Sequence, residues 1–257
     1  MTFAALPDIM VAPNGARRTR ADHPALPVTI PQTVETAKAC FEAGAGGIHA
    51  HVRDADQAHV LDAGLYRELV AELARELPDM AVQITTEAVG RYTPDEQRAV
   101  VRAVMPKMVS VALREMISDA DTTEAARFYY WAHEARIAVQ HILYAPNELS
   151  SLEELVAAGV IPGGELQCLF VLGRYAKDQE SDPLDLLPFL DTLRMSELTA
   201  DWAVCAFGRG ETAALQAAFA AGGKARVGFE NSLWNADGSL AADNAERVRA
   251  IAALRSR

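Results

Sequence analysis

Short apolar runs alternate with longer amphipathic stretches along the whole chain, and this alternation constrains the fold more than any other feature. The apolar runs have the length of buried strands, and the stretches between them repeat apolar residues at helical spacing. Alternating strands and helices favour a largely parallel sheet covered by helices. The expected strands cover residues 8–13, 46–52, 80–86, 108–113, 138–144, 165–172, 201–207 and 225–231.

About eight strand and helix repeats in 257 residues predict a closed (β/α)8 barrel, the TIM barrel, because a doubly wound sheet usually has fewer strands. No linker or low-complexity segment interrupts the series, so we expect a single domain over residues 1–257. Gly44 is expected to end a helix over residues 31–44, and Thr93 to cap a helix that begins with Pro94.

The composition narrows the possible partners. A formal net charge of -11 without a dense basic stretch argues against a nucleic-acid surface. No uncharged apolar run approaches the roughly 20 residues that span a bilayer, so no membrane association is expected. The three cysteines, Cys40, Cys168 and Cys205, are scattered and lack CxxC spacing, which favours core positions in a reducing compartment. The start of the chain lacks a basic segment before its short apolar run, and we expect a cytoplasmic protein.

The stretch GGIHAHVRD, residues 46–54, contains two histidines separated by one small residue. Side chains alternate across a strand, so His49 and His51 share one face. Two imidazoles at the end of a strand can begin a zinc site whose third ligand comes from another strand. Alternatively, one ring hydrogen-bonds a backbone carbonyl and the other is only part of a polar lining.

A third ligand is available in RVGFEN, residues 226–231, where the same alternation places Arg226, Gly228 and Glu230 on one face of the last strand. The second and eighth strands of a closed barrel are separated only by the first. His49, His51 and Glu230 can therefore meet, and a His2Glu set with an open position is typical of catalytic zinc. Glu230 could instead form a salt bridge with Arg226 or Arg53, and either Asp54 or Gln83 could orient a ligand imidazole.

Active sites of such barrels lie at the carboxyl ends of the strands and in the loops that follow. The polar residues expected there are Asn14, Arg17, Arg18, His49, His51, Arg53, Asp54, Thr85, Thr86, Glu87, Ser110, Arg114, Gln140, His141, Arg209, Arg226, Glu230 and Asn231.

Several stretches resemble the β-keto acid cleavage enzymes, whose best-studied type is the 3-keto-5-aminohexanoate cleavage enzyme. They are VAPNGARRT (11–19), HPALPVTIPQTVETAKACFEAGAGGIHAHVRD (23–54), VQITTEA (82–88) and GGKARVGFENSLWNADGSLAADNAERV (222–248). The resemblance implies a (β/α)8 barrel that binds Zn²⁺ through His49, His51 and Glu230. It places Arg226 at the reacting centre as the catalytic residue and Thr85 against the substrate.

The resemblance also implies the reaction: a β-keto acid and acetyl-CoA, the co-substrate, yield acetoacetate and the CoA ester of the shortened acid. Zinc with an open position can polarise a keto oxygen, and the fork of Arg226 suits a carboxylate or a developing enolate. We further expect Ser110 and Asn231 to contact the substrate. The family tends to form tetramers, so a homotetramer is expected, whereas the residues that dock CoA stay unassigned.

The chain departs from the aminohexanoate enzyme in three respects. Glutamate and aspartate, which are associated there with the substrate ammonium group, are replaced by Arg17 and Asn231. We therefore expect a substrate other than 3-keto-5-aminohexanoate, with a distal carboxylate or an uncharged tail near Arg17. On the fifth strand, Gln140 and Ile142 take the places of inward glutamates, although a shift by one residue would turn His141 inward.

Two alternatives follow from these departures. One is a zinc-dependent lyase or hydrolase that does not use CoA and activates water instead. The other is a degenerate barrel that binds a metal or an acidic ligand without turnover, which the unusual fifth strand favours and the intact His49, His51, Arg226 and Glu230 oppose.

Overall fold

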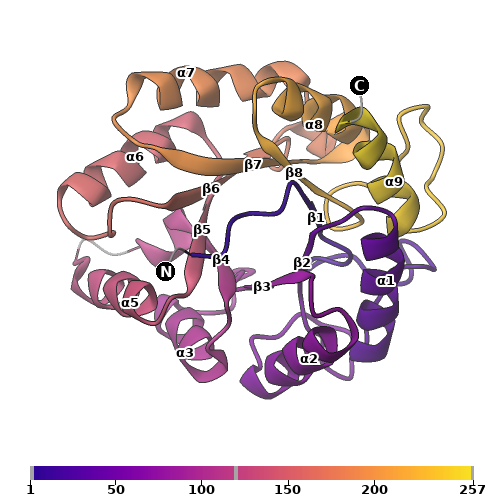
Figure 1. Ribbon diagram of the computed structural model, residues 1–257, viewed down its shortest axis with the longest axis horizontal. Helices are drawn as coiled ribbons and strands as arrows, with labels where there is room; N and C mark the ends of the chain where they lie inside the picture. Colours follow the sequence, from indigo (N-terminus) through magenta and orange to yellow (C-terminus); the bar gives the residue numbers. More distant parts are fainter. Residues whose placement is uncertain (1–2, 119–120, 256–257) are drawn as a thin grey trace.

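The computed structural model describes residues 3–118 and 121–255 and contains a closed barrel of parallel strands in the order β1 to β8 (Figure 1). Helices surround the barrel, so the expected (β/α)8 fold is confirmed. The strands are β1 (Ile9–Val11), β2 (Gly47–Ala50), β3 (Ala81–Thr85), β4 (Met108–Ala112), β5 (Ala138–Leu143), β6 (Leu166–Leu172), β7 (Ala200–Ala206) and β8 (Lys224–Val227).

Each expected strand is present, but every strand except β6 ends earlier than the apolar pattern indicated, and the ends of β2 and β8 bear on the site. Strand β2 ends at Ala50, so His51 lies just beyond it. Strand β8 ends at Val227 and not at residue 231, because Gly228 has φ +138° and turns the chain. A side chain at Gly228 would bring its Cβ within 2.5 Å of the Ala12 carbonyl oxygen. Glycine is therefore required at this turn.

The helices form the outer ring and mostly follow the strands one by one. They are α1 (Ile30–Glu42), α2 (Ala63–Glu76), α3 (Pro94–Val104), α4 (Leu113–Met116), α5 (Thr123–Glu134), α6 (Pro146–Ala157), α7 (Leu187–Met195), α8 (Glu211–Ala220) and α9 (Asn244–Arg255), with 3₁₀ turns η1 (Lys177–Gln179), η2 (Pro183–Leu186) and η3 (Gly208–Gly210). The α3 cap is as predicted, since the Thr93 side chain accepts from the Glu96 amide ahead of Pro94. None of the described helices combines the length and hydropathy needed to cross a bilayer.

Apolar side chains pack mainly in two places, between the strands and the helices and inside the barrel, and a smaller third cluster contains Leu26, Val28, Phe229 and Ala241. The N-terminal segment, residues 3–8, runs across the end of the barrel where the strands begin (Figure 1). The Gln167 side chain donates to the Ala4 carbonyl, and Lys224 donates to the Leu6 carbonyl. This end of the barrel is thereby closed, and the opposite end is left for the site.

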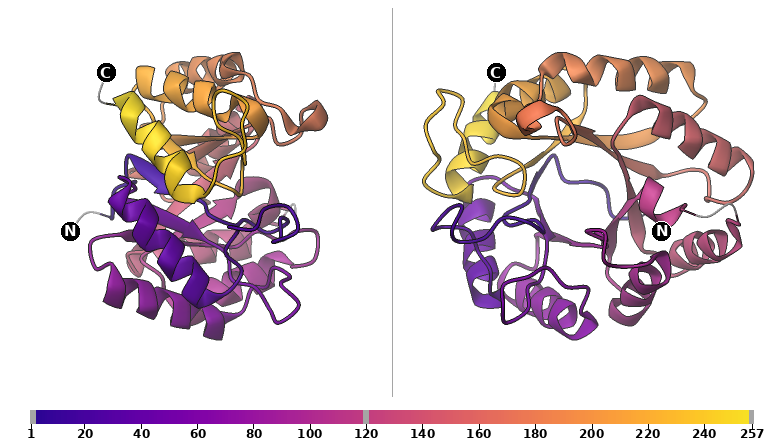
Figure 2. Two further views of the ribbon diagram at one scale, coloured as in Figure 1. Left: turned by 90° about the vertical axis from the view of Figure 1, so that its right-hand side faces the viewer. Right: turned by 180° about the vertical axis from the view of Figure 1, so that it is seen from behind.

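The turn after β8 is held by a buried ion pair between α8 and α9. The Arg247 guanidinium lies 2.7 Å from Glu211 Oε2, and both side chains are inaccessible to solvent. Glu211 Oε1 accepts from the Gly228 amide, and the Asn244 side chain accepts from the Phe229 amide. Two helices thus fix the backbone that carries Glu230. Figure 2 shows α8 and α9 beside each other on the outside of the barrel.

Candidate active site

A cavity opens at the carboxyl ends of the strands, where the fold predicts an active site. Its polar lining comes from strands β2, β3 and β8 and from the loops after β1, β3, β6 and β8. Its apolar lining comes mainly from β4, β5 and β6 and from Phe207 just after β7. The lining residues are Asn14, Gly15, Ala16, Arg17, Arg18, His49, Thr85, Glu87, Ala112, Ile142, Tyr144, Val171, Arg174, Gln179, Phe207, Arg226 and Glu230.

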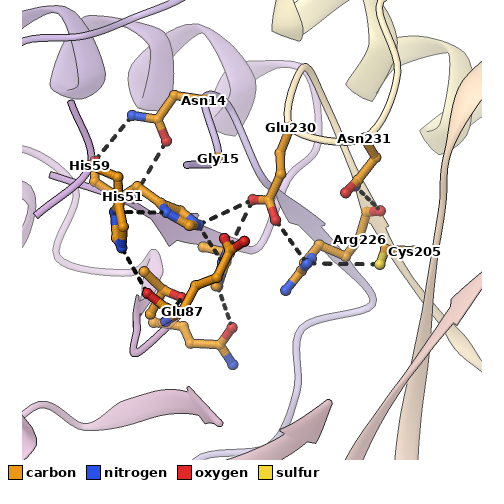
Figure 3. A network of polar contacts seen from close by, with 12 residues as sticks. Asn14, Gly15, His51, His59, Glu87, Cys205, Arg226, Glu230 and Asn231 are labelled. Carbon is orange, nitrogen blue, oxygen red and sulfur yellow. Dashed lines mark hydrogen bonds and ion pairs between the residues drawn. The ribbon is translucent and has the colours of Figure 1, made fainter. Parts of the chain in front are cut away.

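The two histidines and Glu230 meet beside this cavity, as the sequence predicts (Figure 3). Glu230 Oε2 lies 3.6 Å from His49 Nε2 and 3.5 Å from His51 Nε2. The two Nε2 atoms are 3.2 Å apart. One ligand atom of each residue is within 4.8 Å of the others, which is the spacing of a site for a single ion.

A chain of side-chain amides determines which nitrogen of His49 carries the proton. Gln140 Nε2 donates to the Cys168 carbonyl, so its Oε1 accepts from Gln83 Nε2 at 3.0 Å. The side-chain oxygen of Gln83, Oε1, lies 2.8 Å from His49 Nδ1 and accepts its N–H. The lone pair of His49 is therefore on Nε2, which faces Glu230. Gln83, and not Asp54, is the residue that orients the His49 imidazole, because the Asp54 side chain accepts the amides of its own turn.

The second imidazole is oriented by His59. His59 Nε2 donates to the Glu87 carbonyl at 3.0 Å, because a carbonyl can only accept. Burial lowers the pKa of His59 to about 3, so this ring is neutral and its Nδ1 is an acceptor. His51 Nδ1 donates to it at 3.3 Å. The lone pair of His51 therefore also lies on Nε2.

These contacts place three electron-pair donors together with no proton between them. The two Nε2 atoms face each other as acceptors, and Glu230 Oε2 is buried without a hydrogen-bond partner among the described residues. Burial, followed by the charge of Arg226, lowers the pKa of His49 well below its ordinary value. Burial alone would raise the pKa of Glu230, but the charge of Arg226 holds it well below its usual range. Two imidazole nitrogens with free lone pairs and a carboxylate fit a divalent cation of the zinc type and leave a coordination position open.

Arg226 lies beside this set and joins it to the cavity (Figure 3). Its Nη2 donates to Glu230 Oε1 at 3.1 Å and contacts Cys205 Sγ at 3.7 Å. Its Nε and Nη1 are buried without a partner among the described residues, although unpaired buried donors are costly. One guanidinium nitrogen, Nη2, is thus held by Glu230, and Nε and Nη1 are left to donate to a ligand.

Glu230 reaches the two histidines from a different backbone position than the sequence predicts. Arg226 and Glu230 were expected on one face of a continuing strand, but Glu230 lies in the turn after β8, where its amide donates to the Ala12 carbonyl. The backbone of Gly15 packs against the Glu230 side chain, and a Cβ there would approach Cγ within 2.5 Å. Glu230 pairs with Arg226, and Arg53 instead donates to the carbonyls of Asn14, Gly15 and Arg18.

The remaining predicted residues divide into two groups. Arg17 and Thr85 line the cavity, Arg17 at its exposed rim and Thr85 buried with its hydroxyl accepting the Glu87 amide. Ser110 and Asn231 are buried close by but are not part of the cavity wall. The Asn231 side chain donates to the Arg226 carbonyl. On β5, Gln140 points inward, whereas His141 packs against Tyr129 of α5 with ring centroids 5.4 Å apart.

Sequence reasoning missed His59 as a partner of His51. The two residues meet because the chain after β2 folds back at Asp54, so that Arg53 and His59 pair as an antiparallel bridge. The Asp-Ala-Asp-Gln stretch at residues 54–57 is typical of a turn and could have indicated this return. Arg174 and Tyr144, which line the cavity, carried no comparable signal.

Known proteins with similar sequences point to one family. A family model described as beta-keto acid cleavage enzyme matches residues 8–257. The chain is 28% identical over 255 residues to a 3-oxoadipate:acetyl-CoA acetyltransferase of Cupriavidus necator, covering 96% of this chain and 87% of the relative. It is 24% identical over 262 residues to a 3-keto-5-aminohexanoate cleavage enzyme of Fusobacterium nucleatum, covering 96% and 90%.

Among solved structures, the apo structure of ObcA resembles the chain with a TM-score of 0.67 at 16% identity. The match covers 90% of this chain but 61% of that longer one, and at this identity it shows the fold alone. The family match includes β2, β8 and the residues just after them, and thus His49, His51, Arg226 and Glu230. The chain belongs to the beta-keto acid cleavage enzyme family.

Proposed function

We propose that this protein is a zinc-dependent enzyme that converts a β-keto acid and acetyl-CoA to acetoacetate and an acyl-CoA. The observation that carries the proposal is the juxtaposition of three unprotonated ligand atoms with the two unpaired donors of Arg226. The named activity of the relatives, acetyl transfer from acetyl-CoA to a keto acid, supports it. Zn²⁺ held by His49, His51 and Glu230 would supply a Lewis acid for the keto group.

The protein side chains have separate tasks in this reaction. Arg226 is the catalytic residue, since its Nε and Nη1 can donate to the carboxylate of the β-keto acid and to oxygen that gains negative charge. Thr85 lies on the cavity wall and is proposed to contact the substrate through its hydroxyl. Asn231 donates to the Arg226 carbonyl and so positions this arginine. Direct substrate contacts by Ser110 and Asn231 stay predictions.

The substrate we propose is a β-keto acid with a second carboxylate at its far end. Arg17 is at the cavity rim and forms no ion pair with a described residue, so its charge is available to an anionic tail. An ammonium group there would be repelled, which is why 3-keto-5-aminohexanoate is not expected to react. The substrate named for the Cupriavidus necator relative, 3-oxoadipate, has the proposed charge pattern.

A substrate panel tests both parts of the proposal. The purified protein is assayed for acetyl-CoA-dependent acetoacetate with β-keto acids that end in a carboxylate, an alkyl group or an ammonium group. We expect the dicarboxylate to have the highest kcat/KM and Arg17→Glu to reverse this preference. Arg20→Glu, on an exposed arginine outside the cavity, is the matched control. Absence of acetoacetate with every member would exclude the activity, and release of free acid without CoA would favour a hydrolase.

Zinc content is tested independently of turnover. We expect about one Zn²⁺ per chain by elemental analysis of the purified protein and its loss in His49→Ala.

The homotetramer and the cytoplasmic location stay predictions. Light scattering in solution tests the homotetramer.

A further inference from the structure

Two carboxylates line the cavity, and only one of them is engaged by other side chains. Glu230 contacts Arg226 and both imidazoles. Glu87 follows β3, is half-buried, and its carboxylate forms no hydrogen bond or ion pair with a described residue. Figure 3 shows the Glu87 side chain extending from its backbone into the space around Glu230 and Arg226. It does not belong to the three-residue ligand set, so it is available for another task.

The backbone of Glu87 is held on both sides, which limits where its carboxylate can go. Its amide donates to Thr85 Oγ1 at 3.0 Å, and its carbonyl accepts from His59 Nε2 at 3.0 Å. Burial by itself lowers the pKa of Arg226, but acidic neighbours, Glu230 first and Glu87 among them, hold it above its ordinary value. The negative charge of Glu87 therefore contributes to stabilising the protonated guanidinium of Arg226.

The proposed reaction needs a group that removes and returns a proton. Acetoacetate retains C1 and C2 of the β-keto acid, so C2 must lose a proton before it can bond to the acetyl group. Arg226 is cationic and Asn231 is a neutral amide. Burial raises the pKa of Tyr144 well above its ordinary value, so this phenol remains protonated. Among the residues that line the cavity, Glu87 is the carboxylate that is not already a ligand.

We propose that Glu87 is the catalytic general base that takes the C2 proton of the β-keto acid and later returns it; this rests on the proposed function. The C2–H bond breaks, an O–H bond forms on Glu87, and the electron pair enters an enolate whose oxygen faces Arg226. C2 then bonds to the acetyl carbonyl carbon of acetyl-CoA, and the CoA thiolate leaves.

The second half of the reaction restores the base. The thiolate bonds to C3, the original keto carbon, and the C2–C3 bond breaks. Its electron pair remains on C2 of acetoacetate, where the proton from Glu87 is returned. The products are acetoacetate and the acyl-CoA, and no oxidant or additional proton is needed.

Deuterium exchange at C2 tests this assignment without requiring the complete reaction. Enzyme in D2O is mixed with 3-oxoadipate in the absence of acetyl-CoA, and loss of the C2 proton signal is followed by NMR against the uncatalysed rate. We expect exchange by the wild-type protein and at least an approximately 10²-fold slower rate in Glu87→Gln. Glu134→Gln, an exposed position on α5, should retain the wild-type rate.

Two further measurements exclude a structural effect. Glu87→Gln should keep its zinc content, its Tm and a KM within a few-fold of the wild type while kcat falls. Glu87→Ala should be rescued by added formate, since a small carboxylate can occupy the vacated space. A Glu87→Gln variant that exchanges at the wild-type rate, or a wild-type protein with no exchange above background, would overturn the assignment.

The two proposals fail in different ways. If the wild-type protein exchanges C2 in a Glu87-dependent manner but forms no acetoacetate, the base assignment stands and the proposed function fails. If acetoacetate forms at the same rate in the wild type and in Glu87→Gln, the function stands and the base assignment is wrong.

Discussion

At the scale of single residues, Arg226 combines two tasks, because one nitrogen holds Glu230 while two others are left for a ligand. Arg226→Lys retains a charge but not the planar set of donors. We expect kcat to fall by about 10² to 10³-fold, as when a donor to developing negative charge is removed. Steady-state kinetics checks this, with Arg194→Lys on the exposed surface of α7 as the control. An unchanged kcat would show that the unpaired nitrogens do not act on the substrate.

His141 makes stability depend on pH for a reason unrelated to catalysis. Its ring is buried against Tyr129, and burial lowers its pKa from 6.5 to about 4. As the pH falls from 6.5 to 4, the unfolded chain gains a proton that the folded ring does not accept. The free energy of unfolding therefore decreases over this interval, by on the order of 3 kcal/mol from His141.

Urea unfolding of metal-free protein at several pH values measures this contribution. We expect the stability of His141→Leu to decline less than that of the wild type between pH 6.5 and 4. Identical pH profiles would show that the ring is protonated in the folded state as readily as in the unfolded chain. The other buried histidines are present in both proteins, so the difference isolates position 141.

At the scale of elements, strands β2, β3, β5 and β6 together orient the His49 imidazole. The amide chain from the Cys168 carbonyl through Gln140 and Gln83 to His49 crosses the interior of the barrel. Gln140→Leu removes the acceptor of Gln83, which can then rotate and present its NH2 group to His49. We expect zinc affinity to fall by about 10 to 100-fold, the usual effect of losing such a partner.

A competition titration with a chromophoric chelator measures the zinc affinity. Gln140→Glu, which keeps an oxygen acceptor for Gln83, is the matched variant and should lose less affinity than Gln140→Leu. Equal affinities of wild type and Gln140→Leu would mean that the amide chain does not set the protonation of His49.

The elements also show what the sequence could predict about this fold. The apolar periodicity located every strand of the barrel, because a buried strand needs a short run of apolar residues that is visible in the local sequence. It did not locate the end of β8, because Gly228 interrupts the strand through its own backbone conformation while apolar and polar residues keep alternating. Its neighbours Ala12 and Glu211 come from distant segments, so the tight turn depends on tertiary contacts.

The sequence predicts those parts of the site that depend on residue type and on the order of the strands. It does not predict the contacts that depend on how a loop folds back or on which side chains meet across the barrel. His49, His51 and Glu230 came together because parallel strands place their carboxyl ends at one edge. Gln140 was correctly placed inward, although its link to Gln83 needs the register that pairs β3, β4 and β5. His59 reaches His51 through a loop, and nothing in their spacing of eight residues reveals that contact.

At the scale of the whole molecule, the Glu211–Arg247 pair links the outer helices to the turn that carries Glu230. Both side chains are fully buried. Arg247→Met leaves the Glu211 carboxylate buried without its countercharge, which should lower the free energy of unfolding by about 3 to 5 kcal/mol. Urea denaturation measures the loss.

The double variant Arg247→Met with Glu211→Gln supplies the control, because it removes the charge and retains an acceptor for the Gly228 amide. We expect it to recover a large part of the lost stability. If the double variant is no more stable than Arg247→Met alone, the loss arises from packing and not from the unpaired charge.

Strand β1 has only three residues, yet it joins the two strands whose ends carry the ligands. An ion held by His49, His51 and Glu230 would therefore bridge the first and last parts of the chain across the shortest strand of the ring. A growing chain on the ribosome contains both histidines long before Glu230 is synthesised. Full metal affinity would be acquired only when β8 joins β1, so metal loading would report closure of the ring.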